Sequence, residues 1–364
     1  MTTLARVVVL PVEPGPLRIE EVNLPDPGPH QVVIKQLASG ICHTQLHQLH
    51  APRPAPILLG HESSGVVLAV GSKVSHVREG NKVAVTWLPR APQSTARPPG
   101  ISAVTLAGGD VAISQDVFTW ADHSIADEQF VVKLPDDADP ELAAVIGCAV
   151  MTGAGAVLHS ARVAEGESVA VFGVGGVGLC TVAAARIAGA DPIIAVDLDA
   201  TKLGLARHFG ATQEIDASKT DPIGAIHALT RHESFTTVLR LPVSGVDHAF
   251  DCVGTPATMQ QAIAAARTGA FGTRAGGNAV LVAAEGLEAQ LNPIDLLVNE
   301  KRLIGSLGGS CHPERDLPLF LDWHRDGRLD LAALVTRRYA LDEIENATTA
   351  LAAGEINGRA ILKF

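Results

Sequence analysis

A glycine-rich turn carries the most specific chemical signal in the sequence. The segment Gly173-Val-Gly-Gly-Val-Gly178 matches G-x-G-x-x-G, follows the apolar run SVAVF and opens the helical run VGLCTVAAARIAGA. In this context Gly173 permits a tight turn, Gly175 lets a pyrophosphate approach the backbone, and Gly178 allows the helix to pack on the strand. The free N–H groups at the helix N-terminus, near Gly176, would bind the phosphates. The segment therefore predicts a dinucleotide site, although the same turn could also join a strand and a helix in a sheet that binds nothing.

An acidic residue after the next strand supports the dinucleotide interpretation. Asp197 ends the run PIIAVD and lies 19 residues after Gly178. A carboxylate at this place accepts hydrogen bonds from the ribose hydroxyls and would repel a 2′-phosphate. The sequence thus favours NAD over NADP.

Cysteine and histidine side chains could supply metal ligands elsewhere in the chain. The five cysteines are Cys42, Cys148, Cys180, Cys252 and Cys311. This odd, sparse set argues against a disulfide scaffold and indicates a reducing compartment. Two thiolates and one imidazole form a known donor set for a zinc ion with an open fourth position. Spacing alone, however, does not identify which residues would form it.

The elements that would position these residues change character near Val150. Before it, short alternating runs such as QVVIKQLAS and SGVVLAVG predict strands separated by turns. After it, apolar strands alternate with helical runs, which predicts parallel βαβ units. From about Ser306 we expect one or two helices and a final strand in RAILKF. The segments 232–244 and 268–277 fit neither pattern and are expected to be surface loops.

Composition excludes several classes of protein. The chain has 364 residues, of which 47% are hydrophobic, so it can bury a sizeable core and is not intrinsically disordered. The net charge of −11 argues against a nucleic-acid partner. The best candidate for a membrane span, residues 142–158, is shorter than the ~20 residues required, and the N-terminus lacks the pattern of a signal peptide. We therefore expect a cytoplasmic protein with no membrane partner.

Five motifs together resemble one protein family. GICHTQLH, LLGHESSGVV, VIGCAVMTGAG, VFGVGGVGL and GRAILKF occur in the order and approximate spacing of the zinc-dependent alcohol dehydrogenases, within the medium-chain dehydrogenase superfamily. The resemblance runs from near residue 5 to the C-terminus. It implies an α/β protein with a GroES-like (chaperonin-10-like) β-barrel catalytic domain at 1–149 and 307–364, and a Rossmann domain with a doubly wound parallel sheet at 150–306. It also implies an active site in the cleft between these domains and a homodimer or homotetramer.

The resemblance assigns the zinc ligands and a proton path. The family's ligands are a cysteine in GICHT, a histidine in GHE and a cysteine in IGC, which correspond here to Cys42, His61 and Cys148. Glu62 follows the histidine and would be an alternate ligand. Zinc lowers the pKa of a bound alcohol, so that an alkoxide can pass hydride to the nicotinamide. Thr44 and His47 correspond to the hydroxyl and the histidine that carry the alcohol proton away.

The resemblance also implies contacts to the cofactor and substrate. The basic residue after the first zinc cysteine corresponds to His43, and the lysine near the ribose corresponds to Lys202. The two strand-end residues beside the nicotinamide are Val253 and Val282, and the phosphate-binding arginine is Arg359. For Lys202 a solvated helix charge is an equally simple interpretation. Trp87 and Trp120 align with aromatic positions of the substrate channel and would give an apolar, flat-walled pocket, although either indole could instead fill the domain core.

Two features depart from the family pattern. Many members carry four closely spaced cysteines that bind a structural zinc, but this chain has no cysteine between Cys42 and Cys148. Because a structural site needs four ligands, we expect one catalytic zinc, no structural zinc, and a metal-free loop around PRAPQSTARPPG. Gln45 stands where the family commonly has the aspartate that orients the zinc-binding histidine, so zinc affinity could differ.

These observations predict an NAD-dependent alcohol dehydrogenase that interconverts an alcohol with an aldehyde or ketone. The expected substrates are small molecules, above all primary aromatic or medium-chain alcohols. One alternative is an aldehyde or enal reductase of the same superfamily in which zinc is incidental. Another is a redox-inactive NAD-binding module, which would have no need for an open metal position beside Thr44 and His47.

Overall fold

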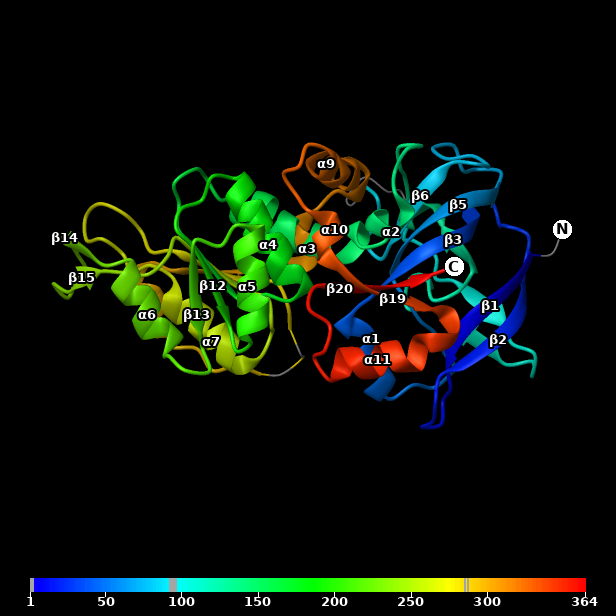
Figure 1. Ribbon diagram of the computed structural model, residues 1–364, viewed down its shortest axis with the longest axis horizontal. Helices are drawn as coiled ribbons and strands as arrows, with labels where there is room; N and C mark the ends of the chain where they lie inside the picture. Colours follow the sequence, from blue (N-terminus) through cyan, green and yellow to red (C-terminus); the bar gives the residue numbers. More distant parts are fainter. Residues whose placement is uncertain (1–2, 92–96, 285, 287) are drawn as a thin grey trace. The chain divides into compact units, whose positions relative to one another are not determined.

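The computed structural model describes residues 3–91, 97–284, 286 and 288–364 (Figure 1). The chain forms two compact units. The first contains residues 1–148, 312–327 and 331–364, and the second contains 149–311 and 328–330. The chain therefore leaves the first unit after Cys148 and returns to it at His312, whereas the boundaries expected from the sequence are 149 and 307.

The first unit is built mainly from strands. They are β1 (Thr3–Leu10), β2 (Arg18–Leu24), β3 (Gln31–Ile41), β4 (Ile57–Leu58), β5 (Glu62–Val70), β6 (Lys82–Thr86), β7 (Ala103–Thr105), β8 (Val111–Ile113), β9 (His123–Asp127), β10 (Val131–Lys133), β19 (Val335–Ala340) and β20 (Arg359–Lys363). One sheet has the order β2-β1-β4-β8-β7 and the other β10-β6-β5-β3-β20-β19, with β9 also paired to β3. Because β20 pairs with β3, the C-terminal strand lies directly beside the strand that leads to Cys42.

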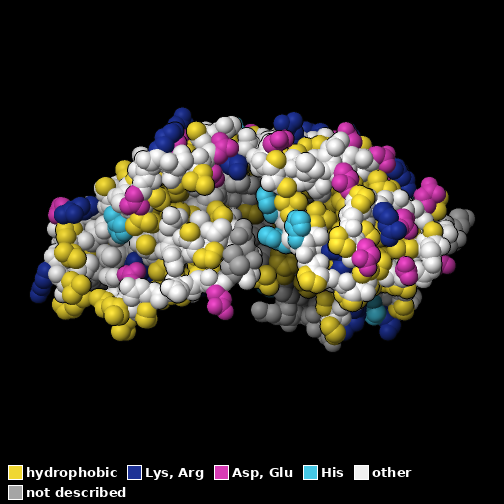
Figure 2. All heavy atoms as spheres, turned by 90° about the horizontal axis from the view of Figure 1, so that it is seen from below, with side chains coloured by type: hydrophobic (Ala, Val, Ile, Leu, Met, Phe, Trp, Pro, Cys, Tyr) yellow, Lys and Arg dark blue, Asp and Glu magenta, His cyan; other side chains and the backbone are white. Residues whose placement is uncertain are grey.

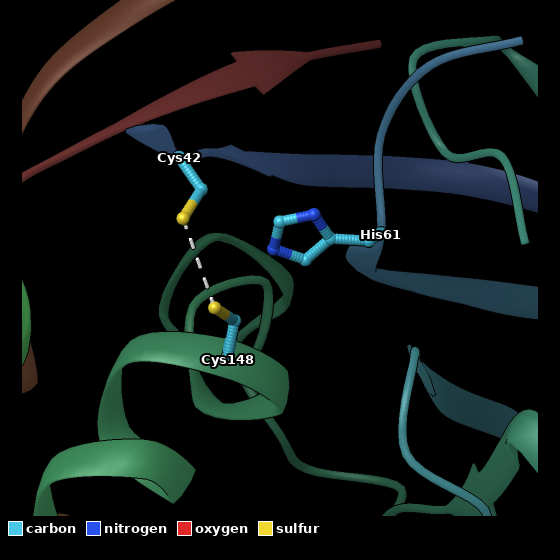
Figure 3. Close-up of side chains that lie close together, drawn as sticks. All are labelled: Cys42, His61 and Cys148. Atoms are coloured by element: carbon cyan, nitrogen blue, oxygen red, sulfur yellow. Dashed lines mark hydrogen bonds between the residues drawn. The ribbon is translucent and has the colours of Figure 1, made fainter. Parts of the chain in front are cut away.

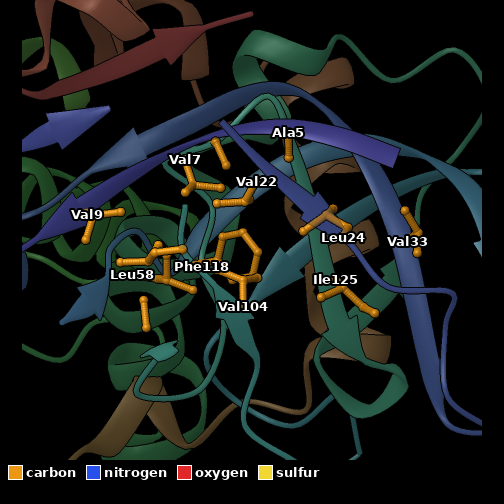
Figure 4. Close-up of a cluster of buried hydrophobic side chains, with 13 residues drawn as sticks. Ala5, Val7, Val9, Val22, Leu24, Val33, Leu58, Val104, Phe118 and Ile125 are labelled. Carbon is orange, nitrogen blue, oxygen red and sulfur yellow. The ribbon is translucent and has the colours of Figure 1, made fainter. Parts of the chain in front are cut away.

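Strand β1 shows why the core of the first unit has two faces. Successive side chains of a strand point to opposite sides, and on β1 both sets are apolar. Val7 and Val9 enter one buried cluster with Phe118 (Figure 4), whereas Val8 and Leu10 enter a second. The second cluster also contains side chains of α11 (Ile344–Ala352). The other α-helices of the unit are α1 (His43–His50), α2 (Pro140–Ala143), α9 (Pro313–Arg325) and α10 (Leu331–Leu334).

The second unit contains a six-stranded parallel sheet with the order β13-β12-β11-β16-β17-β18. Its strands are β11 (Val169–Phe172), β12 (Ile193–Asp197), β13 (Gln213–Asp216), β16 (His248–Asp251), β17 (Asn278–Leu281) and β18 (Arg302–Gly305). Its α-helices are α3 (Met151–Gly155), α4 (Gly176–Ile187), α5 (Ala200–Phe209), α6 (Pro222–Leu229), α7 (Pro256–Ala265) and α8 (Pro293–Asn299). This strand order, with helices between the strands, is the doubly wound arrangement of dinucleotide-binding domains.

The segment 232–244 corrects an expectation from the sequence. It is not a simple loop but a hairpin of β14 (His232–Thr236) and β15 (Pro242–Val243). The pattern was missed because β14 is exposed and lacks the alternation of buried apolar residues that identifies a strand. The Phe271 amide donates to the Thr236 carbonyl at 2.9 Å, so the second unexplained segment packs on the hairpin. Figure 2 shows apolar side chains gathered at this end of the second unit.

Every helix within the described residues is too short or too polar to cross a membrane.

Candidate metal centre and dinucleotide turn

Two buried cysteines and one half-buried histidine of the first unit converge at the start of α1 (Figure 3). Cys42 lies between β3 and α1, and His61 immediately precedes β5. Cys148 lies in a turn of π-helix at Ile146–Val150, a local irregularity of a kind that is frequent at functional sites. Residues far apart in the sequence therefore meet because β3 ends, β5 begins and a helical turn passes at the same place.

The geometry of these three residues fits a tetrahedral metal ion. Their donor atoms lie within 4.8 Å of one another, and the Cys42 and Cys148 Sγ atoms are 3.9 Å apart. Two thiolates bound at 2.3 Å to a tetrahedral zinc would be separated by about 3.8 Å. The His61 Nε2 atom is buried and has no hydrogen-bond partner among the described residues. An unpartnered imidazole nitrogen facing two thiols is the donor set expected of a zinc site with an open position.

The electrostatics of the centre favour a thiolate. The hydrogen bond from the Cys148 thiol lowers the pKa of Cys42 well below its usual value, and the guanidinium of Arg359 and the His61 ring add to this effect. The same hydrogen bond, together with burial, raises the pKa of Cys148. Cys42 is therefore the thiol that ionises more readily, and binding of a divalent cation would also require Cys148 to lose its proton, because metal ligands must be deprotonated.

A buried ion pair lies beside the metal ligands. Arg359 of β20 donates through Nη2 to Glu62 Oε1, and both side chains are almost completely buried. Burial raises the pKa of Glu62, while the positive charge of Arg359 opposes that rise. The second oxygen, Oε2, has no partner among the described residues. Gly40 on β3 leaves the space for this carboxylate, since a Cβ there would lie 2.3 Å from Oε1. The assignment of Glu62 as an alternate ligand remains a prediction.

Gln45 makes two hydrogen bonds that fix the first turn of α1. Its Oε1 accepts from the Cys42 amide at 3.2 Å, and its Nε2 lies 2.5 Å from Nδ1 of His61. An amide nitrogen that donates to Nδ1 requires the imidazole proton to sit on Nε2, the atom that would bind metal. A metal-bound imidazole carries its proton on Nδ1 and needs an acceptor there. The glutamine therefore suits the metal-free site better than the loaded one.

This conflict predicts that Gln45→Asp strengthens zinc binding. A carboxylate can accept from both the Cys42 amide and the His61 Nδ1–H. The glutamine amide has only one acceptor oxygen, and in this arrangement that oxygen is used by the Cys42 amide. We expect the zinc dissociation constant to fall about tenfold to a hundredfold, the usual size of such effects. Competition with a chromophoric chelator measures it, and Gln45→Asn, which keeps the amide, is the matched control. Equal zinc affinity in Gln45→Asp and the native protein would contradict this account.

The remaining residues assigned to proton transfer lie on α1. Thr44 Oγ1 is 3.5 Å from Cys42 Sγ, and the Thr44 side chain is exposed. His47 lies one turn further along the helix and is also exposed. His43, also exposed, starts the helix. The proton path remains a prediction, with its first member placed beside the metal ligands.

The two tryptophans assigned to the substrate pocket have different surroundings. Trp120 is fully buried in a core cluster, and its indole N–H donates to the Gly40 carbonyl at 3.1 Å. A side chain without exposed surface lines no open channel, so Trp120 is a core residue in this structure. Trp87 follows β6 and is half-buried, and its indole N–H has no partner among the described residues. Trp87 alone remains a candidate for the pocket wall.

Sequence reasoning missed one carboxylate near the centre. Asp116 is half-buried. Burial raises the pKa of its carboxyl group, and the nearby His61 ring only partly opposes that rise. The neighbouring Thr119 and Trp120 amides donate to the Leu59 carbonyl, which brings this segment alongside His61. No motif in the sequence signals this placement, because Asp116 stands in a segment without regular periodicity.

The glycine-rich turn of the second unit has the geometry that phosphate binding requires. Gly173 has a φ of 80°, which glycine adopts freely. A Cβ on Gly178 would lie 1.9 Å from the Gly173 carbonyl oxygen, so helix α4 can approach β11 only with glycine there. A Cβ on Gly175 would meet nothing within 4 Å, which leaves its backbone open to a ligand. Gly176 is the first residue of α4.

Most of the other residues assigned to the cofactor belong to the second unit, as the turn does. Asp197 ends β12, and its carboxylate accepts from the Val174 amide at 2.8 Å. Val253 follows β16 and lies against the turn, since a Cβ on Gly173 would be 2.3 Å from its Cγ2. Val282 follows β17 and Lys202 lies in α5, both half-buried. Arg359 belongs to the first unit, where its guanidinium donates to Glu62.

Two alanine substitutions separate the two roles of glycine in this turn. We expect Gly178→Ala to destabilise the second unit by about 1–3 kcal/mol, because the methyl group overlaps a backbone oxygen. Gly175→Ala should leave the melting temperature within a few degrees of the native value, since the methyl group meets open space, yet weaken dinucleotide binding at least tenfold. Thermal unfolding and cofactor titration measure the two effects. If both variants lost stability equally, the open face assigned to Gly175 would be wrong.

A candidate thiolate–imidazole metal site in one unit and a glycine-rich turn in the other are typical of zinc-binding dehydrogenases, and comparisons with known proteins agree. Residues 176–325 match the family model "Zinc-binding dehydrogenase", and residues 28–136 match "Alcohol dehydrogenase GroES-like domain". The chain is 32% identical to an alcohol dehydrogenase class-3 of Cereibacter sphaeroides, over 98% of both chains. It is also 32% identical to a geraniol dehydrogenase of Castellaniella defragrans, over 96% of this chain and 95% of that one.

Solved structures give the same result. A zinc-binding-domain alcohol dehydrogenase protein from Burkholderia ambifaria superimposes with a TM-score of 0.88 at 31% identity, and covers 100% of both chains. A benzyl alcohol dehydrogenase from Acinetobacter calcoaceticus gives a TM-score of 0.84 at 26% identity, over 100% of this chain and 99% of that one. The protein belongs to the zinc-dependent alcohol dehydrogenase family of the medium-chain dehydrogenases. The predicted combination of GroES-like and Rossmann domains is confirmed, and the chain is an alcohol dehydrogenase-type oxidoreductase.

Proposed function

We propose that this protein oxidises a primary alcohol to an aldehyde with NAD, or catalyses the reverse reaction, with one zinc ion per chain. The observation that carries the proposal is the convergence of Cys42, His61 and Cys148, in which the buried Nε2 atom of the half-buried imidazole has no hydrogen-bond partner among the described residues. A zinc ion bound there would lower the pKa of an alcohol in its open position. Thr44, whose Oγ1 is 3.5 Å from Cys42 Sγ, would accept the alcohol proton, and exposed His47 would release it to solvent.

NAD is favoured over NADP by the carboxylate of Asp197. It is half-buried at the end of β12 and accepts from the Val174 amide, which holds it beside the turn. A fixed negative charge there would accept hydrogen bonds from ribose hydroxyls and repel a 2′-phosphate. The absence of cysteine between Cys42 and Cys148 further supports a protein without structural zinc.

The substrate class is supported by the relatives and by one residue of the chain. Two of the similar proteins are named for geraniol and benzyl alcohol, which are both primary alcohols on an unsaturated carbon framework. Half-buried Trp87 would give such a substrate a flat apolar wall. We therefore propose aromatic or medium-chain primary alcohols as substrates.

The decisive experiment tests a panel of aliphatic, allylic and benzylic alcohols with NAD and with NADP, and monitors the absorbance of the NADH or NADPH that forms. Elemental analysis of the same preparation should give about one zinc per chain, and a chelator should abolish turnover until zinc is restored. Full activity after zinc removal would favour the reductase in which zinc is incidental. Cofactor binding without turnover of any substrate would favour the redox-inactive module.

A further inference from the structure

The second unit has a polar cavity at the edge of its sheet opposite to the glycine-rich turn. The turn follows the carboxyl end of β11, whereas the cavity, of about 190 Å³, opens where the strands begin. The first residues of three neighbouring strands, His248, Asn278 and Arg302, lie in one row of the sheet register and line it. The opposite wall is the segment 267–277 that joins α7 to β17. The cavity is thus separate from the dinucleotide turn.

The two carboxylates that line the cavity are fully engaged within the protein. Asp247 accepts from the Ser168 amide and hydroxyl, each at 3.0 Å, and from Arg267 and Arg274 at 3.0 and 2.9 Å. Glu167 Oε2 lies 2.8 Å from the Ala164 amide and from His248 Nε2. A bound cation would have to displace several of these donors. The acidic groups therefore do not make this a cation site.

Two of the three arginines of the cavity, by contrast, have N–H groups that donate to no described residue. Arg267 is almost completely buried and held by Asp247 and by the Ala275 carbonyl at 2.7 Å. Arg274 reaches the two carboxylates through Nη2 only, and its Nε and Nη1 make no hydrogen bond to any described residue. The guanidinium of Arg302 has no hydrogen bond or ion pair within the described part of the chain. Arg274 and Arg302 are both exposed, so their remaining N–H donors face solvent and are available to a ligand.

The charge of the cavity is opposite to that of the chain. The three arginines outnumber the two carboxylates, while the whole protein carries a net charge of −11. Both ring nitrogens of His248 are engaged within the protein, because Nε2 lies 2.8 Å from Glu167 and Nδ1 lies 3.1 Å from the Asn278 amide nitrogen. A locally positive pocket in an acidic protein attracts anions selectively.

The size of the cavity limits its ligand. At roughly 30 Å³ per water molecule, it has room for about six waters. Organic ligands of drug size need roughly 300 Å³ or more. Guanidinium groups bind phosphate and carboxylate through paired N–H donors. We propose that this cavity binds a small oxyanion, either a phosphate group or a carboxylate, held by Arg274 and Arg302.

The test is a calorimetric titration of inorganic phosphate into zinc-loaded protein that is saturated with NAD. The ionic strength is kept constant with chloride. NAD occupies the dinucleotide turn, so that phosphate cannot bind there. We expect one phosphate per chain, binding at least tenfold more weakly in Arg302→Gln and not detectably in the Arg274→Gln/Arg302→Gln variant. Arg337→Gln, which removes an exposed arginine from β19 of the first unit, is the matched control and should bind as the native protein does.

A parallel titration with succinate distinguishes the two sources of the oxyanion. Succinate that competes with phosphate identifies a carboxylate-binding site, and phosphate binding without competition identifies a phosphate site. The proposal is overturned if neither anion binds the native protein beyond chloride, or if the Arg302→Gln and double variants bind as tightly as the native protein.

Discussion

Cys148→Ala protein is expected to contain no tightly bound zinc and to lose alcohol oxidation by at least a thousandfold. The substitution removes one of three donors from a site whose fourth position must stay open for substrate, and two protein ligands do not hold the ion in that geometry. Dinucleotide affinity should stay within about twofold of the native value, because the glycine-rich turn lies in the other compact unit. Elemental analysis, steady-state kinetics and cofactor titration on one preparation measure the three quantities.

Cys180→Ala is the matched control for this prediction. Cys180 is also buried, but it lies in α4 and takes no part in the thiolate pair. Its replacement should leave zinc content and turnover close to native, so that general damage from losing a buried thiol is accounted for. Turnover by a zinc-free Cys148→Ala protein would show that the assigned metal centre is not needed for the reaction.

The glycine-rich turn and the βαβ order of the second unit could be predicted from the sequence because their signals are local, whereas its β14–β15 hairpin could not. The strand, the glycine turn and the helix follow one another within residues 168–187, and each glycine has a role fixed by its immediate neighbours. Asp197 ends the next strand of the same sheet, so its place beside the turn follows from the βαβ connection. Periodicity and spacing were sufficient here.

The metal centre could not be derived in the same way. Cys42, His61 and Cys148 are brought together by pairing between distant strands, and only the resemblance to a family selected them. The contact between Glu62 and Arg359 joins residues 297 positions apart, and depends on β20 pairing with β3. The burial of Trp120 depends likewise on the closure of the sheets around it. Such contacts are tertiary, so no local pattern encodes them.

The ion pair leads to the second large expected effect. Arg359→Met should lower the free energy of unfolding of the first unit by about 3–5 kcal/mol in the metal-free protein, because it leaves the Glu62 carboxylate buried without its counter-ion. Methionine is of similar length, so the loss of packing is small. All three tryptophans, Trp87, Trp120 and Trp323, belong to the first unit, and their fluorescence during urea unfolding therefore reports on that unit.

A second substitution separates the ion pair from any role in cofactor binding. In the Glu62→Gln/Arg359→Met double variant both charges are gone, and replacing a whole buried pair is often nearly neutral, so most of the lost stability should return. Dinucleotide affinity should not return with it if Arg359 also binds the phosphates, because the guanidinium is still missing. Recovery of both quantities would limit Arg359 to neutralising Glu62. If the single variant were as stable as the native protein, the buried carboxylate would have to be protonated without its partner, and the ion pair would hold no structural role.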